Sequence, residues 1–145
     1  RAVTCASRVY LERHGEPAHP DELRRHTGLQ YSNLGYRQHW QYETPKGETV
    51  FGQPQIRIRA NNGEALAWAA VAGLGITTGP TFILGGYLRE GSLVSILNDY
   101  RRPAVGIYAL YPPGRMLPRR IRVFSDFLAG RFGDHPYWDE GLEDS

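Results

Sequence analysis

Short polar side chains stand at three places where a helix or an irregular segment is predicted to begin. Ser7 follows a short apolar run, Ser32 and Asn33 open a segment without periodicity, and Asn61 precedes an apolar helical run. Hydroxyl and amide groups donate and accept hydrogen bonds, so they suit the binding of polar ligand atoms. Ser7 stands where a helix cap belongs, and the segment from Ser32 is predicted to be a loop of the kind that commonly carries binding groups. Trp40, beside the irregular segment, is a candidate for stacking against a ligand.

The clearest of these signals is the helix start at Asn61. Its side chain can accept a hydrogen bond from a free amide of the first turn, and Glu64 can reach back to the Asn61 amide, as in a capping box. The amino end of a helix carries a partial positive charge, which favours an anion or a polar ligand atom. The alternative is that Asn61 only caps a structural helix, which Gly73 then ends.

Sequence signatures of several catalytic classes are missing. Gly73, Gly75 and Gly79 follow a predicted helix and precede a strand, whereas a dinucleotide-binding fingerprint needs the reverse order. The sequence holds neither a glycine-rich phosphate loop ending in Lys and Ser or Thr nor a Gly-x-Ser-x-Gly motif. The five histidines include no helical pair that would aim two imidazoles at one metal ion. The sequence therefore predicts neither an enzyme, nor a metal site, nor a bound cofactor.

Composition indicates an ordinary globular domain. A length of 145 residues is typical of about one domain, and a hydrophobic share of 41% is enough for a core. The net charge of +2 is too small to predict nucleic-acid binding by this chain. The single Cys5 excludes an internal disulfide and fits a reducing compartment, and no apolar run is long enough to span a membrane. The start at Arg1, directly before strand-like residues, suggests a piece of a longer protein.

The predicted elements alternate between strands and helices, which is typical of an α/β layer structure with a parallel or mixed sheet. Strands are predicted at 2–6, 29–31, 55–59, 93–97 and 105–111, between Gly73 and Pro80, and in a hairpin of 40–43 with 49–51. Helices are predicted after Ser7, from Pro20, after Asn61, around Phe82 to Leu88, and after Pro118 through Ile121, Phe124 and Leu128. The acidic tail from Asp134 is expected to be loosely held, apart from Tyr137 and Trp138.

In their order and spacing, these segments resemble the effector-binding, or substrate-binding, domain of the LysR-type transcriptional regulators. The resemblance covers nearly the whole chain and rests on residues 6–15, 23–32, 40–42, 60–80, 88–94, 107–112 and 119–128.

The resemblance implies a periplasmic-binding-protein-like (type 2) fold, in which two α/β subdomains joined by two crossing strands bind a small molecule between them. Residues 1–104 would form subdomain II with the end of the first crossing strand. Residues 105–133 would form the return strand and helix of subdomain I, and residues 134–145 a C-terminal tail. The front half of subdomain I and the DNA-binding winged helix-turn-helix would lie outside this sequence.

The resemblance also implies which residues face the cleft, and each has capping or turn formation as its alternative role. These residues are Ser7, Tyr31, Ser32, Asn33, Trp40, Asn61 and Asn62. The expected protein is a bacterial, cytoplasmic regulator that binds a small-molecule effector and acts as a homodimer or homotetramer. It would bind DNA only through the missing N-terminal domain and would not contact a membrane. The rival interpretations are a solute-binding module of a transport system and an enzyme on the same fold.

Overall fold

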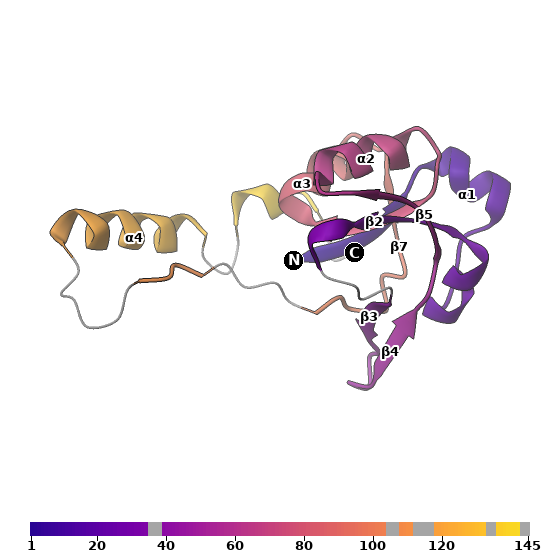
Figure 1. The fold of residues 1–145 in the computed structure, drawn as a ribbon, viewed down its shortest axis with the longest axis horizontal. Coiled ribbons are helices and arrows are strands. Elements are labelled where there is room, and N and C mark those ends of the chain that lie inside the picture. The colour runs from indigo at the N-terminus through magenta and orange to yellow at the C-terminus, as the bar shows by residue number, and fades with distance from the viewer. Residues whose placement is uncertain (35–38, 104–107, 112–117, 133–135, 143–145) are drawn as a thin grey trace.

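A five-stranded mixed sheet lies at the centre of the molecule, in the order β5-β2-β6-β1-β7 (Figure 1). The computed structural model describes residues 1–34, 39–103, 108–111, 118–132 and 136–142. The strands of this sheet are β1 (Ala2–Ala6), β2 (Thr27–Tyr31), β5 (Gln55–Ala60), β6 (Ile76–Pro80) and β7 (Val94–Ile96). β2 pairs in parallel with β5 and β6, whereas β1 runs antiparallel to β6 and β7. The predicted α/β class with a mixed sheet is confirmed.

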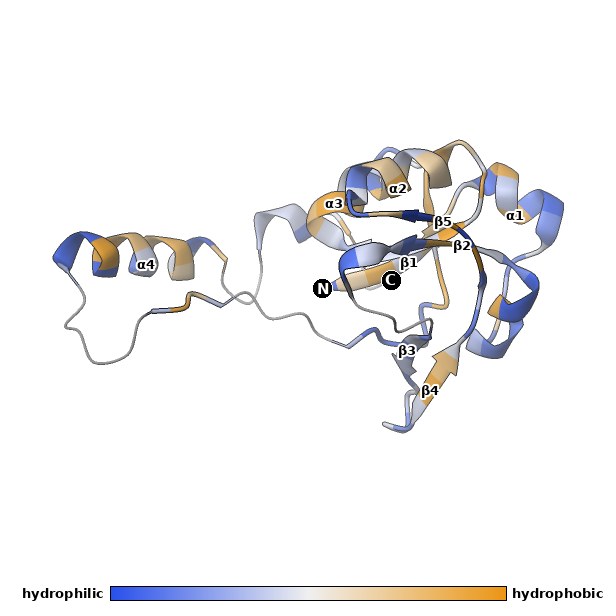
Figure 2. Cartoon of the chain, viewed as in Figure 1, coloured by the Kyte–Doolittle hydropathy of each residue, from blue (hydrophilic) through white to orange (hydrophobic). Residues whose placement is uncertain are grey.

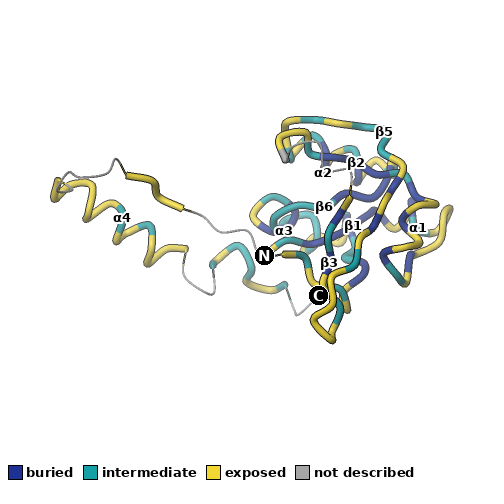
Figure 3. Tube along the Cα trace, turned by 60° about the horizontal axis from the view of Figure 1, so that its bottom comes forward, coloured by how far each residue is buried: buried dark blue, intermediate teal, exposed yellow. Residues whose placement is uncertain are grey.

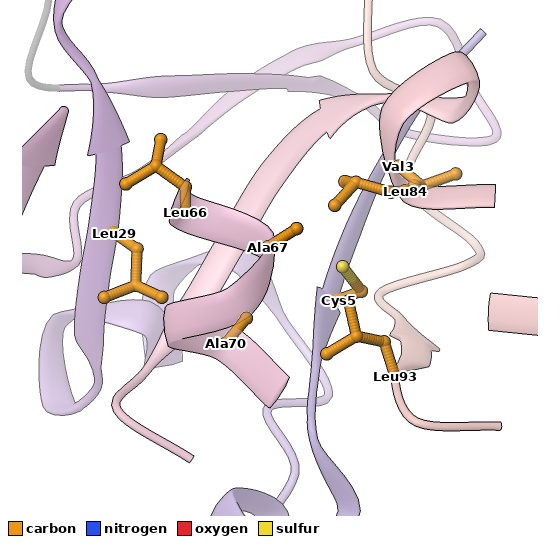
Figure 4. Close-up of a cluster of buried hydrophobic side chains, with 8 residues drawn as sticks. All are labelled: Val3, Cys5, Leu29, Leu66, Ala67, Ala70, Leu84 and Leu93. Atoms are coloured by element: carbon orange, nitrogen blue, oxygen red, sulfur yellow. The ribbon is translucent and has the colours of Figure 1, made fainter. Parts of the chain in front are cut away.

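Two helices, α2 (Gly63–Val71) and α3 (Thr81–Arg89), cover one face of the sheet. Side chains alternate along β1, so Val3 and Cys5 point toward these helices and pack in the first core (Figure 4). That core consists of Val3, Cys5, Leu29, Leu66, Ala67, Ala70, Leu84 and Leu93. The small alanines of α2 let the helix lie close to the strands, because little side chain separates the two layers.

The other face of the sheet is covered by α1 (Arg8–His14), the 3-10 helix η1 (Pro20–Arg25) and the hairpin of β3 (Trp40–Glu43) and β4 (Thr49–Gly52). Their second core consists of Ala6, Tyr10, Leu23, Trp40, Tyr42, Ile76, Ile96 and Leu97. Thr4, which alternates with Val3 and Cys5, bonds to the Tyr42 hydroxyl across this face at 3.0 Å. Figure 3 shows the buried residues of both cores inside the same body.

Local signals predicted several element ends correctly. Ser7 caps α1 by accepting a hydrogen bond from the Tyr10 amide at 3.4 Å. Gly73 follows α2 with a φ of 77°, in the left-handed region expected of a helix stop. The hairpin forms at the predicted residues. The helix predicted around Phe82 to Leu88 is present as α3, although Gly85 and Gly86, whose helix propensity is low, lie inside it.

β5 lies at the edge of the sheet, with one side of its backbone unpaired by any described strand. Exposed and half-buried residues alternate along it, and Arg57 and Arg59 are among the exposed ones. Two arginines on an edge strand are a common way of keeping a sheet edge soluble.

The prediction of a return strand at 105–111 is wrong for residues 108–111, the part of it that the structure describes. Residues 105–107 lie outside the described residues, and Tyr108–Tyr111 form no strand. Tyr108 and Leu110 are 82% and 91% exposed, so this stretch makes little contact with the sheet. Without a neighbouring strand, a run of this kind has no partner for its backbone groups.

The helix predicted after Pro118 is present as α4 (Arg119–Arg131), but it stands apart from the body (Figure 1). None of its residues is buried, and its apolar side chains Val123, Phe124 and Phe127 are exposed. Figure 2 shows these apolar stretches on α4 outside the main body. Within the described residues, no helix is both long and apolar enough to cross a membrane.

The tail is held at Tyr137 and Trp138, the two residues excepted from the loose tail, and the expectation is wrong for the described residues that follow them as far as Leu142. The 3-10 helix η3 (Tyr137–Asp139) packs against α3, where the Trp138 ring meets Phe82 at 6.0 Å between centroids. Arg89 of α3 donates to the carbonyl of Trp138 at 2.9 Å. The Arg1 guanidinium donates to the carbonyl of Leu142 at 2.7 Å. These contacts link the tail to α3 and to the start of β1.

Candidate functional site

Most of the predicted binding residues lie at one edge of the sheet, which we call the carboxyl edge. It is defined as the edge where β2, β5 and β6 end and β1 begins, because Tyr31 pairs with Ala60 and Ala2 pairs with Pro80. α2 and α3 both start here. Ligands of open sheets with parallel strands commonly bind beyond the carboxyl ends of the strands.

The two asparagines lie between β5 and α2, and their roles differ from the predicted ones. Asn62, not Asn61, caps α2, since its side-chain oxygen accepts from the amides of Glu64 at 2.9 Å and Ala65 at 3.3 Å. The predicted capping box is therefore wrong, because the cap is Asn62, one residue after the predicted Asn61. Glu64 instead accepts a hydrogen bond from the Tyr87 hydroxyl at 2.9 Å. Asn61 is exposed and makes no side-chain hydrogen bond to the described part of the chain.

The second predicted group follows β2 at the same edge. Tyr31 is half-buried, and Ser32 and Asn33 are exposed in the short 3-10 turn η2 (Ser32–Leu34). The Asn33 amide donates to the Tyr31 hydroxyl at 3.3 Å, and the Ser32 hydroxyl donates to the Asn33 oxygen at 3.4 Å. These weak local bonds leave most of the hydrogen-bonding capacity of Ser32 and Asn33 open to solvent or to a ligand.

Trp40 is placed differently from the other candidates. Its side chain is 2% exposed in the second core, and its indole nitrogen donates to the Gln30 side-chain oxygen at 2.7 Å. In this conformation the ring lies in the core and not on the exposed part of the carboxyl edge. The sequence analysis missed Gln30, although a glutamine inside a buried strand indicates a required hydrogen bond.

Ser7 lies at the opposite edge from the other candidates. β1 runs antiparallel to β6, so its carboxyl end, which Ser7 follows, adjoins the start of β6. Ser7 is 3% exposed, and its hydroxyl is used in capping α1. The structure thus brings together Tyr31, Ser32, Asn33, Asn61 and Asn62 but does not bring Ser7 to them.

The chemistry available at the carboxyl edge is hydrogen bonding. The candidate side chains are amides and hydroxyls, and the amino end of α2 adds its partial positive charge. Together they can hold polar or anionic ligand atoms. The described residues contain no group of three or more His, Cys, Asp and Glu side chains that could hold a metal ion.

Marked pKa shifts occur in the cores. Burial raises the pKa of the Cys5 thiol to about 12, and burial likewise raises the pKa of Tyr42 to about 12. His26, whose Nδ1 lies 3.3 Å from the Tyr10 hydroxyl, has a pKa lowered mainly by burial. These shifts follow from removing the charged form from water and do not assemble a catalytic pair.

Comparison with known proteins identifies clear relatives. The family model described as the LysR substrate binding domain matches residues 1–133. An HTH-type transcriptional regulator of Haemophilus influenzae is 38% identical over 121 residues, which are 83% of this chain and 42% of that protein. The HTH-type transcriptional regulator PtxR of Pseudomonas aeruginosa is 31% identical and matches 93% of this chain and 43% of that protein. The chain therefore spans less than half the length of these relatives.

Solved structures show the same likeness. The full-length Vibrio cholerae virulence activator AphB is 35% identical, with a TM-score of 0.76 over 89% of this chain and 44% of AphB. CrgA of Neisseria meningitidis is 28% identical, with a TM-score of 0.69 over 92% of this chain and 45% of CrgA. The regulatory domain of AphB from Vibrio vulnificus, at 32% identity and a TM-score of 0.70, matches 89% of this chain and 63% of that chain.

Proposed function

This chain belongs to the LysR substrate-binding domain family, and we propose that it is the part of a transcriptional regulator that senses a small-molecule effector. Its fold is the periplasmic-binding-protein-like (type 2) fold of the regulatory domains that it resembles. The relatives named above are transcriptional regulators and not solute-binding proteins of transport systems, so the sensing role is favoured over the transport role.

The observation that supports this proposal is the placement of the polar groups. Ser32, Asn33 and Asn61 are exposed at the carboxyl edge, where two strand ends and the start of α2 meet. A few polar groups beside apolar strands are the usual composition of a small-molecule site. The effector is bound there by hydrogen bonds and is not chemically converted.

The second wall of the site belongs to another subdomain. In the proposed division, residues 1–104 form subdomain II with the first crossing strand, and residues 105–133 belong to subdomain I. The exposed apolar side chains of α4 support this division, because such a face is usually covered in the complete protein. Residues 134–145 form the tail.

Sensing requires that the effector bind one arrangement of the two subdomains better than another. Closure over the carboxyl edge then shifts the balance between two shapes of a homodimer or homotetramer. DNA is contacted through a separate N-terminal domain, and the protein acts in the cytoplasm.

The proposal is tested on the longer protein that contains both subdomains. Small organic acids, amino acids and sugars are screened for a rise in melting temperature, since a ligand that binds only the folded state stabilises it. Asn33→Ala and Asn61→Ala should reduce the rise for the best compound by weakening its binding about tenfold or more. Ser7→Ala, at the opposite edge, is the matched control.

If no compound in a broad panel stabilises the two-subdomain protein, the sensing role is wrong. If Ser7→Ala weakens binding and the asparagine variants do not, the site lies at the other edge of the sheet.

A further inference from the structure

A buried hydrogen-bonded pair lies beneath the turn that carries Ser32 and Asn33. The Trp40 indole N–H donates to the Gln30 side-chain oxygen at 2.7 Å, and the Gln30 side-chain nitrogen donates to the Tyr31 carbonyl at 3.2 Å. Gln30 is 4% exposed and Trp40 is 2% exposed, so water has little access to the bond between these two side chains.

This pair links β2 to β3. Gln30 is the last residue but one of β2, and Trp40 is the first residue of β3. The turn η2, which presents Ser32 and Asn33, begins directly after β2. A bond that fixes the end of β2 removes conformations of Tyr31 and of this turn that would otherwise have to be lost when a ligand binds.

We propose that Gln30 is a positioning residue, which Trp40 holds in one orientation so that the Tyr31 carbonyl and the turn after it are fixed for effector binding. The inference rests on the proposed sensing function. It gives Trp40 a different role from the predicted stacking on a ligand: the ring acts through Gln30 from inside the core.

The chemistry of the pair supports a role beyond packing. A leucine or methionine at position 30 would fill a buried strand position without needing a partner. The glutamine oxygen instead accepts from Trp40 and its amide donates to the Tyr31 carbonyl, so two hydrogen bonds fix the orientation of the side chain. Loss of either partner would leave a buried polar group unpaired, which is more costly than never having it.

The first test measures how well the turn η2, residues 32–34, is ordered in the chain without a ligand. Trp40→Phe keeps a buried ring but removes the donor, and Gln30→Met keeps the length but removes both bonds. In each variant, exchange of the amides of residues 32–34, followed by NMR, should become about fivefold faster or more, the factor expected for one lost hydrogen bond.

A matched control is available in β5. Gln55 also lies in a strand and donates to a backbone carbonyl, that of Arg24, at 3.0 Å. It is the first residue of β5 and so lies at the end of that strand away from the carboxyl edge. Gln55→Met should leave exchange at residues 32–34 unchanged. Equal exchange in Trp40→Phe, Gln30→Met and the wild type would overturn the proposal.

The second test separates orientation from packing by a pH profile. In Gln30→Glu, the protonated carboxyl can accept from Trp40 and donate to the Tyr31 carbonyl, whereas the carboxylate can only accept. Burial raises the pKa of such a carboxyl above its usual value near 4.3. The exchange rate of the amides of residues 32–34, corrected for its intrinsic pH dependence, should therefore be close to wild type at low pH. It should rise as the carboxyl ionises.

The Trp40 indole resonance should report the same transition. The titratable groups of the wild type, including His39 and Tyr31 next to the pair in sequence, are present in both proteins, so the wild-type profile removes their contribution. A flat profile in a folded Gln30→Glu variant would also overturn the proposal. Because neither measurement uses an effector, these results are independent of the ligand screen, whose failure would instead overturn the sensing function.

Discussion

At the scale of single residues, Asn61 and Asn62 have separate roles although they are chemically identical neighbours. The Asn62 side chain is committed to the first turn of α2, whereas Asn61 is exposed. Sequence alone places a cap in this pair but does not decide which residue it is, because the choice depends on where the chain leaves β5. The difference gives a direct test of the structure.

Asn62→Ala should lower the free energy of unfolding by about 1 kcal/mol, because two amides of α2 lose their acceptor. Asn61→Ala should change it by less than about 0.5 kcal/mol, as is usual for an exposed residue without a structural bond. Urea denaturation of both variants and of the wild type measures these changes in the free energy of unfolding. Equal losses would mean that the cap is shared between the two residues.

Cys5 provides a second residue-scale prediction, on the dependence of stability on pH. Burial raises the pKa of its thiol from 9.0 to about 12, so the folded state disfavours the thiolate. The stabilising contribution is complete below the unfolded value, near 8.5 to 9, and is lost as the pH rises toward 12. Stability should fall over this range, and Cys5→Ala should reduce the slope by up to about 1.4 kcal/mol per pH unit.

Alkaline urea titrations measure the two slopes of stability against pH. Tyr42, whose pKa is also raised to about 12, contributes equally to both proteins.

A thiol reagent at pH 8 should label Cys5 only after unfolding, because the side chain is fully buried. Rapid labelling of the native chain would show that Cys5 is accessible.

At the scale of elements, the contact between α3 and the tail depends on a missing side chain. A Cβ added at Gly85 would lie 3.2 Å from the Trp138 carbonyl and 3.2 Å from a Leu142 methyl group, whereas one at Gly86 would meet no atom within 4 Å. The tail lies so close to α3 that a side chain at residue 85 would require the Trp138 carbonyl or Leu142 to move, by a few tenths of an ångström for a Cβ and further for a larger side chain.

Gly85→Val should displace the tail, and Gly86→Val is the matched control in the same helix. In Gly85→Val the tryptophan emission should shift to longer wavelength as Trp138 becomes solvated, and proteolysis near residue 136 should become at least several times faster. If both variants behave alike, the contact does not depend on the space at Gly85.

Much of the local structure could be predicted from sequence, because its causes are local. Ser7 and Gly73 mark helix ends through bonds and backbone angles within a few residues. The opposite placement of Ser7 and Asn61 could not be predicted in this way. It follows from the antiparallel pairing of β1 with β6, which joins residues more than 70 positions apart.

The fixed position of the tail has the same kind of cause. Its acidic composition suggested a loosely held segment apart from Tyr137 and Trp138, but Arg89 and the space at Gly85 lie about 50 residues earlier in the chain. The exposure of polar residues after strands, such as Ser32 and Asn61, follows from local sequence. The burial of Trp40 against Gln30 could not be predicted, because it depends on a contact between two strands.

At the scale of the whole molecule, α4 is the helix whose apolar side chains the described part of the chain leaves uncovered. Its apolar side chains are exposed, and none of its residues contributes to either core. The stability of the body should therefore be independent of these side chains, whereas the surface properties of the chain should depend on them strongly.

Phe124→Ser with Phe127→Ser should lower binding of a hydrophobic dye to this chain at least severalfold. The same pair should leave the free energy of unfolding of the body within about 0.5 kcal/mol of wild type. In a longer protein that contains both proposed subdomains, the wild-type helix should bind little dye, because the rest of the proposed subdomain I would cover it. A large loss of stability in the short chain would show that α4 packs against the body in solution.

The open side of β5 has a consequence for how this protein behaves at high concentration. Any second strand that added to this edge, from a neighbouring copy or a nascent chain, would have to take Arg57 and Arg59 partly out of water beside its own backbone. Two like charges on one short edge strand thus discourage fibril growth.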